Sequence, residues 1–97
     1  MNQDKNIIWP SYINSEICLS DGRKISKKNS IKKPNINELY EAAKKLNLNP
    51  ILESEKKYPK NFFENKGRII INKTKLYKKK ELLIIISKII KENRNIK

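Results

Sequence analysis

The chain has 97 residues, of which 37% are apolar, and this fits one folded domain while leaving no room for a second independent core. Lysine and arginine number 23 against 10 acidic residues, and the net charge of +13 favours nucleic acid or an anionic membrane surface as the partner. Without histidine, and with a single cysteine, the chain lacks Cys–His, Ser–His and ordinary zinc sets, so we expect no enzyme, no metal site and no cofactor.

The N-terminal third predicts one strand and one long loop. Residues 7–13 are rich in β-branched and aromatic side chains, and Pro10, which has no N–H, should confine this strand to a sheet edge. Residues 14–33 show no helical periodicity and predict a loop, which at this length is usually functional or disordered. Few apolar residues could anchor it, so we expect much of it to be mobile in the free protein. These possible anchors are Ile17, Leu19, Ile25 and Ile31.

The lone Cys18 in this loop is interpreted as a small, buried or half-buried hydrophobic residue. A single cysteine cannot form an internal disulfide, which suits a reducing, cytoplasmic compartment. The N-terminus has no apolar segment typical of a signal peptide. The longest apolar run, residues 82–86, is far too short for a membrane span, so we expect no membrane insertion.

A first helix is predicted after Pro34. Asn35 and Glu38 have the spacing of a capping box, in which each side chain accepts from the other residue's backbone N–H. Asn47 suits a left-handed residue after the helix. The apolar side chains between these signals recur at helical spacing and form one stripe. They are Ile36, Leu39, Tyr40, Ala43 and Leu46.

The C-terminal half predicts two strands and a second helix. Residues 51–55 form a short strand, and residues 68–72 form a strand that is apolar on both faces and therefore central. Residues 79–93 form an amphipathic helix whose isoleucine face covers the sheet, while Ser87 faces solvent with the lysines.

The element order is therefore β-α-β-β-α. We expect an α/β fold of the α+β two-layer sandwich kind: a three-stranded antiparallel sheet, its third strand in the middle, covered on one face by two helices. Residues 1–97 should form a single RNA-binding domain, with 1–6 and 94–97 as frayed ends.

Positive charge is unevenly spread along the chain. Residues 19–33 sum to +5 and residues 69–97 to +7, whereas residues 34–50 are neutral, which indicates an organised basic surface. The run from Lys66 to Ile71 begins like the central strand of an RNA-recognition motif but has isoleucine where that motif stacks aromatic rings. The remaining mode of RNA binding is contact between protein loops and RNA phosphates, which suits structured RNA. Arg68 contributes a positive charge to such contacts.

Two loops are the candidate RNA contacts. In the first, Gly22 permits a turn with positive φ, and Arg23 beside Lys24 offers a planar fork for a phosphate or a guanine edge. Further cations follow at Lys27, Lys28, Lys32 and Lys33. A merely solvated basic loop is the alternative.

In the second loop, Pro59 stiffens the backbone and Tyr58 can stack on a base, with Lys57 and Lys60 on either side. The alternative is a tyrosine packed beneath its own loop. Trp9, Phe62 and Phe63 are interpreted as core or loop anchors rather than ligand contacts.

Four motifs in this order resemble the nineteen-kilodalton protein family of the signal recognition particle in its short archaeal form. They are Ile7–Ile13, Gly22–Ile25, Lys33–Pro34 and Lys57–Lys60, and the resemblance runs from Ile7 to Asn93.

The resemblance implies a β-α-β-β-α domain that binds signal recognition particle RNA in co-translational protein targeting. Its two loops would grip the tetraloop tips of RNA helices six and eight and hold them together. The signal-sequence-binding GTPase subunit would then assemble, mainly through the RNA, on a monomeric protein in the cytoplasm. By the same resemblance, Gly22, Arg23 and Lys24 belong to the first RNA loop and Tyr58, Pro59 and Lys60 to the second. Tyr12 would support or touch the RNA between them.

Three departures from the family pattern predict weaker or re-routed RNA contacts. Residues 14–21 are apolar and slightly acidic where the family is basic, Lys60 replaces an arginine, and Ser26 replaces a proline that stiffens the loop. The surplus lysines of the first loop would offset this loss.

Two other functions remain open from the sequence. A basic module for other structured RNA, such as ribosomal RNA, would ignore the tips of helices six and eight. A membrane-surface or protein-interaction module would use the amphipathic last helix.

Overall fold

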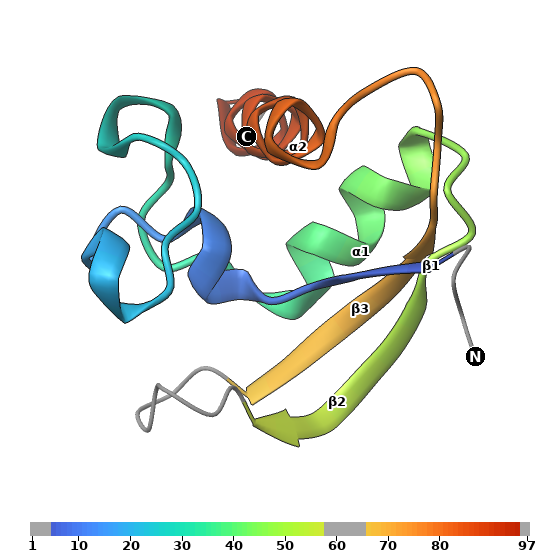
Figure 1. The fold of residues 1–97 in the computed structure, drawn as a ribbon, viewed down its shortest axis with the longest axis horizontal. Coiled ribbons are helices and arrows are strands. Elements are labelled where there is room, and N and C mark those ends of the chain that lie inside the picture. The colour runs from blue at the N-terminus through green and yellow to red at the C-terminus, as the bar shows by residue number, and fades with distance from the viewer. Residues whose placement is uncertain (1–4, 58–65, 96–97) are drawn as a thin grey trace.

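The computed structural model describes residues 5–57 and 66–95. Its strands and helices are β1 (Lys5–Ile8), α1 (Ile36–Lys45), β2 (Ile51–Lys57), β3 (Lys66–Asn72) and α2 (Lys79–Asn95). Between β1 and α1 lie three short 3₁₀ turns, at Pro10–Ile13, Leu19–Asp21 and Lys27–Asn29. The strands form one antiparallel sheet in the order β1-β3-β2, and both helices lie on the same side of it (Figure 1). The predicted two-layer sandwich with its third strand in the middle is confirmed.

The first strand is shorter than predicted, because the chain leaves the sheet after Ile8. Pro10 opens a 3₁₀ turn, where its fixed φ and missing N–H fit the first helical position better than a strand. Ser11 and Ile13 of this turn are fully buried. β1 lies at the sheet edge, as predicted.

The expectation that residues 1–6 and 94–97 fray is wrong for four residues. Lys5 and Asn6 belong to β1 and pair with β3. Arg94 and Asn95 continue α2 beyond its predicted end at residue 93. Pairing with β3 holds Lys5 and Asn6 in place, and the side-chain bonds of Arg94 hold the end of α2.

The core lies between the sheet and the two helices. Ile69 and Ile71 point from the central strand into it, because alternate residues of a strand face the same side. Ser87 is buried too, against the prediction that it faces solvent. It lies four residues after Leu83 and three before Ile90, and this spacing places it on the buried face of α2.

Helix α1 begins as predicted. The Asn35 side-chain oxygen accepts from the Glu38 N–H at 2.9 Å, and a Glu38 carboxylate oxygen accepts from the Asn35 N–H at 3.1 Å. Asn47, just after the helix, has a φ of 60°, which confirms the predicted left-handed residue.

Gly67 is required where β3 passes under α1. Its φ is +94°, and a β-carbon there would lie 2.5 Å from the Cδ1 atom of Ile36. Any side chain would force Ile36 to move and would strain the backbone as well. The β2–β3 pairing shifts register nearby, between Glu53 and Lys57.

Candidate nucleic-acid interface

Residues 14–33 are folded against the rest of the protein, so the expectation of a largely mobile loop is wrong. The Ile31 N–H donates to the Ile13 carbonyl at 2.9 Å, and the Ser15 N–H donates to the Ile31 carbonyl at 2.8 Å. The side chains of Ile25 and Ile31 are 1% and 4% exposed and belong to the main core. Figure 1 shows this segment beside the C-terminal part of α2.

The other two anchors expected in the loop contribute less. Ile17 is half-buried, whereas Leu19 is 61% exposed. Cys18 is exposed, so its interpretation as a buried or half-buried residue is wrong. It caps the turn at Leu19–Asp21, where the backbone and not the side chain makes the hydrogen bonds.

Gly22 and Arg23 set the shape of the first loop. Gly22 has a φ of 126°, which confirms the predicted positive-φ turn. The Arg23 guanidinium turns inward: Nε donates to the Ile25 carbonyl and Nη1 donates to the Ile17 carbonyl, both at 2.8 Å. In the free protein this side chain therefore holds the loop together. Its predicted contact with RNA stays a prediction.

The structure places Lys24 over the ring of Tyr12. The Lys24 ammonium is 5.3 Å from the ring centroid, and the Lys24 N–H donates to the Tyr12 carbonyl at 2.8 Å. A second ammonium, that of Lys79 at the start of α2, is 5.1 Å from the same centroid. Two of the predicted residues thus lie together, and they meet a cation that the sequence reasoning missed.

Desolvation lowers the pKa of Lys79, and repulsion from Lys24 and Lys73 lowers this pKa further. Lys73 and Lys79 follow β3 in a lysine-rich stretch that was counted in the sequence only as regional charge. The sequence contains one signal that could have pointed to Lys79. Residues 78–80 are all lysines at a helix start, where positive charge is unfavourable. We call Tyr12, Lys24, Lys73 and Lys79 the Tyr12 cluster.

Lys27 and Lys28 are exposed on a capped 3₁₀ turn. Ser26 caps this turn by accepting from the Asn29 N–H, and its carbonyl accepts from the Ser30 hydroxyl at 2.8 Å. The side chain and the carbonyl of Ser26 therefore both help to hold this turn. Both lysines remain available to phosphates.

The end of α2 holds the far end of the loop through bonds from Arg94, which we call the Arg94 clasp. Arg94 Nη1 donates to the Lys32 carbonyl at 2.9 Å, and Nη2 donates to the Lys33 carbonyl at 3.3 Å. The same guanidinium pairs with both carboxylate oxygens of Glu38, at 2.6 and 2.7 Å, and the bond to Glu38 raises the pKa of Arg94. Lys91 adds a bond from its ammonium to the Lys28 carbonyl at 3.3 Å. The loop lysines keep their charged ends outward while their backbone is fixed.

Arg68 is engaged on the sheet. Its Nε lies 2.5 Å from a carboxylate oxygen of Glu53, its partner in the β2–β3 pairing, and its guanidinium lies 5.2 Å from the centroid of the Trp9 ring. Trp9 is buried, which confirms its interpretation as an anchor. The predicted RNA contact of Arg68 would have to compete with these bonds.

The second predicted loop falls largely outside the described residues. Lys57 is the last residue of β2, and nothing is described of its side chain. Tyr58, Pro59 and Lys60 lie outside the described residues, as do Phe62 and Phe63.

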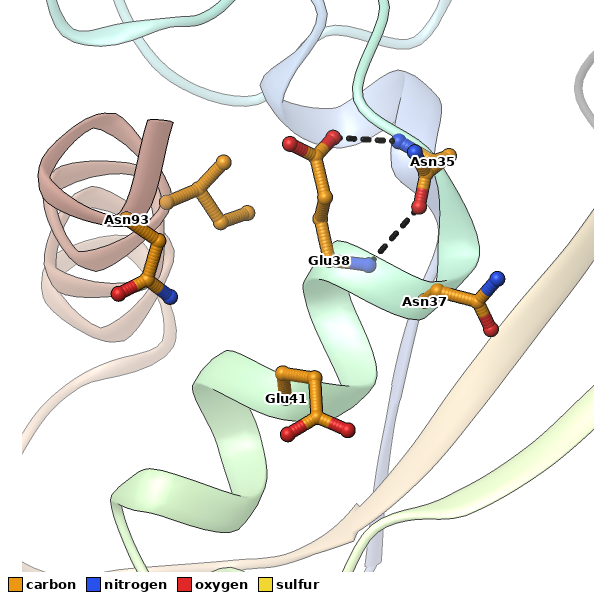
Figure 2. A pocket seen from close by; sticks show the side chains of 6 residues that line it. Asn35, Asn37, Glu38, Glu41 and Asn93 are labelled. Carbon is orange, nitrogen blue, oxygen red and sulfur yellow. Dashed lines mark hydrogen bonds between the residues drawn. The ribbon is translucent and has the colours of Figure 1, made fainter. Parts of the chain in front are cut away.

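A groove of about 280 Å³ lies between α1 and α2, and Figure 2 shows the side chains that line it. Glu38 in this groove is committed to the capping box and to Arg94. The groove also contains Ile90 and Asn93 of α2, which lie roughly 16–21 Å along the helix from Lys79 at the 1.5 Å rise per residue. It is therefore separate from the Tyr12 cluster.

Within residues 5–57 and 66–95, no helix is both long and apolar enough to cross a membrane. The same residues contain no group of three or more cysteine or acidic side chains placed to hold a metal ion.

Comparison with known proteins shows the family. The model of the SRP19 protein family matches residues 7–93. The signal recognition particle 19 kDa protein of Methanosphaera stadtmanae is 42% identical over 91 residues, which cover 94% of this chain and 98% of that protein. The corresponding protein of Methanopyrus kandleri is 36% identical over 92 residues, covering 95% and 87%.

Solved structures agree with this result. A crystal structure of SRP19 in complex with the S domain of signal recognition particle RNA matches with a TM-score of 0.80 and 38% identity, covering 88% of this chain and 95% of that one. The SRP19 of Sulfolobus solfataricus, also in complex with S-domain RNA, matches with a TM-score of 0.62 and 30% identity over 93% and 86%. The chain belongs to the SRP19 family, the 19 kDa proteins of the signal recognition particle.

Proposed function

We propose that this protein binds the S domain of signal recognition particle RNA and acts as an assembly component of that particle in protein targeting. The observation that carries the proposal is the match, over 88% of the chain, to an SRP19 solved on that RNA. The net charge of +13 and the folded basic loop agree with an RNA partner.

The binding mechanism has an electrostatic part and a shape part. Exposed lysines such as Lys27 and Lys28 neutralise phosphates and release counterions, which makes affinity depend strongly on salt. Arg23 and Arg94 fix the backbone of the first loop before RNA arrives. Binding then loses less conformational entropy than a mobile loop would, and the loop presents one shape to the RNA.

At finer detail, the first loop takes the tetraloop tip of one RNA helix and the loop at Tyr58–Lys60 takes the other, so that helices six and eight are held side by side. The clamped RNA then receives the signal-sequence-binding GTPase subunit, a contact made mainly through the RNA. The protein works as a monomer in the cytoplasm, and the mechanism needs no cofactor, no metal and no catalytic step.

The direct test is binding to an S-domain fragment that contains helices six and eight, in parallel with the same fragment carrying replaced tetraloops. We expect tight binding to the first and a large loss with the second, at every salt concentration tested. Equal affinity and equal salt slope for both RNAs would mean that the protein is only a folded polycation, and the proposal would fall.

Substitutions test the role of the two loops. Tyr58→Ala should weaken binding by about 1–3 kcal/mol, the usual cost of a lost specific contact. Arg23→Ala should weaken binding as well, because the first loop loses the bonds to the Ile17 and Ile25 carbonyls that hold its shape. Lys88→Ala is the control, because Lys88 is an exposed lysine of α2 outside both loops. If all three variants lose the same affinity, the loops have no special role.

A further inference from the structure

The Tyr12 cluster joins two parts of the chain that are remote in sequence. Tyr12 and Lys24 come from the N-terminal third, whereas Lys73 directly follows β3 and Lys79 begins α2. The Lys24 and Lys79 ammonium groups approach one ring at 5.3 and 5.1 Å from its centroid. They therefore lie within about 10 Å of each other, roughly one Debye length at 0.1 M salt, where salt screens their repulsion only partly.

The surroundings of Lys79 disfavour its charged form. Desolvation, and then repulsion from Lys24 and Lys73, lowers the pKa of Lys79, although the Tyr12 ring attracts its ammonium group. Ionisable groups with shifted pKa values concentrate at functional sites, and a ligand of opposite charge would reduce the repulsion among these lysines.

The segment around the cluster has the composition of a nucleic-acid contact. Leu76 and Tyr77 are 79% and 39% exposed between β3 and α2. Lysines surround them on both sides of the connection, and an exposed aromatic ring among lysines is typical of surfaces that hold RNA strands. These lysines are Lys73, Lys75, Lys78, Lys79 and Lys80.

We propose that Lys24 and Lys79, whose ammonium groups both lie over the Tyr12 ring, bind one backbone phosphate of the RNA, so that the first loop and the start of α2 hold the same strand. Lys73 adds positive charge beside them. This inference rests on the proposed function and adds to it a contact in which Lys24 of the first loop acts together with Lys79 of α2. The ligand class is a nucleic-acid phosphodiester, recognised by charge and not by base.

The test compares Lys79→Gln with Lys88→Gln on the S-domain fragment. Both substitutions remove one exposed lysine charge from α2, but only Lys79 belongs to the cluster. We expect Lys79→Gln to weaken binding about tenfold and to reduce the salt slope by about 1, the value for one phosphate contact. Lys88→Gln should change affinity about twofold or less, and Lys79→Arg should restore most of the loss.

Two further measurements distinguish one shared phosphate from separate contacts made by each lysine. The double variant Lys24→Gln/Lys79→Gln should lose little more than the stronger single variant, because both lysines serve the same phosphate. Binding at alkaline pH, measured by calorimetry in buffers of different ionisation enthalpy, should take up more protons for the wild type than for Lys79→Gln. Additive losses, or equal proton uptake, would overturn the proposal.

The outcomes also distinguish this inference from the function on which it rests. If the wild type does not discriminate between native and replaced tetraloops, the proposed function fails. If it does discriminate and Lys79→Gln binds RNA like Lys88→Gln, only the phosphate site fails. Wild-type binding to phosphatidylserine vesicles that is lost in Lys79→Gln, with RNA affinity unchanged, would assign the cluster to a membrane surface and overturn the proposal.

Discussion

The loop at residues 14–33 and the connection at residues 73–78 both carry clustered lysines, yet they are built differently. The long loop places Ile25 and Ile31 in the core and ties its backbone with the guanidinium of Arg23. The short connection leaves Leu76 and Tyr77 exposed. Loop length is thus a poor guide to order in this protein, because inward-facing side chains decide it.

Removal of a core anchor should have the largest effect. Ile25→Ala deletes a side chain that is 1% exposed, and such changes cost about 2–4 kcal/mol through lost burial and the cavity that remains. Urea unfolding monitored by circular dichroism measures the change. Leu76→Ala in the connection is the matched control and should cost less than about 0.5 kcal/mol. Similar losses in the two variants would contradict the difference between the regions.

Loss of the Arg23 guanidinium should have the second-largest effect on stability. Arg23→Met keeps much of the side-chain stem but leaves the carbonyls of Ile17 and Ile25 without their donor, at a cost of about 1–3 kcal/mol. Hydrogen exchange should show reduced protection of the Lys24 amide, which bonds to the Tyr12 carbonyl. Unchanged protection there would mean that Arg23 does not hold the loop.

Loss of the outer clasp should matter less, because it is more exposed. Arg94→Gln breaks the pair with Glu38 and the bonds to the carbonyls of Lys32 and Lys33, and we expect a loss of about 0.5–1 kcal/mol that shrinks at high salt. Lys91→Gln, which removes one bond at 3.3 Å, should cost less. The reverse order would refute the clasp.

The smallest effect concerns Lys79, the first residue of α2 after the short connection, and takes the form of a pH dependence. The pKa of Lys79 in the folded protein lies below its ordinary value of 10.5, so the unfolded chain binds more protons between the two values. In that window the contribution of Lys79 to the free energy of unfolding rises with pH. The free energy of unfolding of the wild type should therefore increase relative to that of Lys79→Gln as the pH approaches 10.5. If the difference in free energy of unfolding between the wild type and Lys79→Gln decreases as the pH rises, the lowered pKa of Lys79 is contradicted.

Much of the fold could be predicted because its signals are local. The capping box at Asn35 and Glu38 and the apolar stripe of α1 need only neighbours in sequence. The first strand was predicted too long because Ile13 is as β-prone and apolar as the residues before Pro10, although it enters the core from a 3₁₀ turn. Here tertiary burial, which no single segment encodes, decided the conformation.

The candidate site was harder to predict, because its members meet only through the fold. Lys24 was found from its place beside Gly22, whereas Lys79 lies 55 residues later in the sequence and meets Tyr12 only once α2 has packed on the sheet. The order of the first loop was missed for a similar reason. Its clasp comes from Arg94, in a segment expected to fray. Long side chains that bond to distant carbonyls leave no pattern in a single sequence.

The clasp by Arg94 also has a consequence for the timing of biosynthesis. A ribosome makes the chain from the N-terminus, and Lys32 precedes Arg94 by 62 residues. The loop can begin to collapse while the nascent chain emerges, but its outer fastening forms only after the last turn of α2 has left the exit tunnel. A stalled or prematurely terminated chain would thus present an unfinished loop.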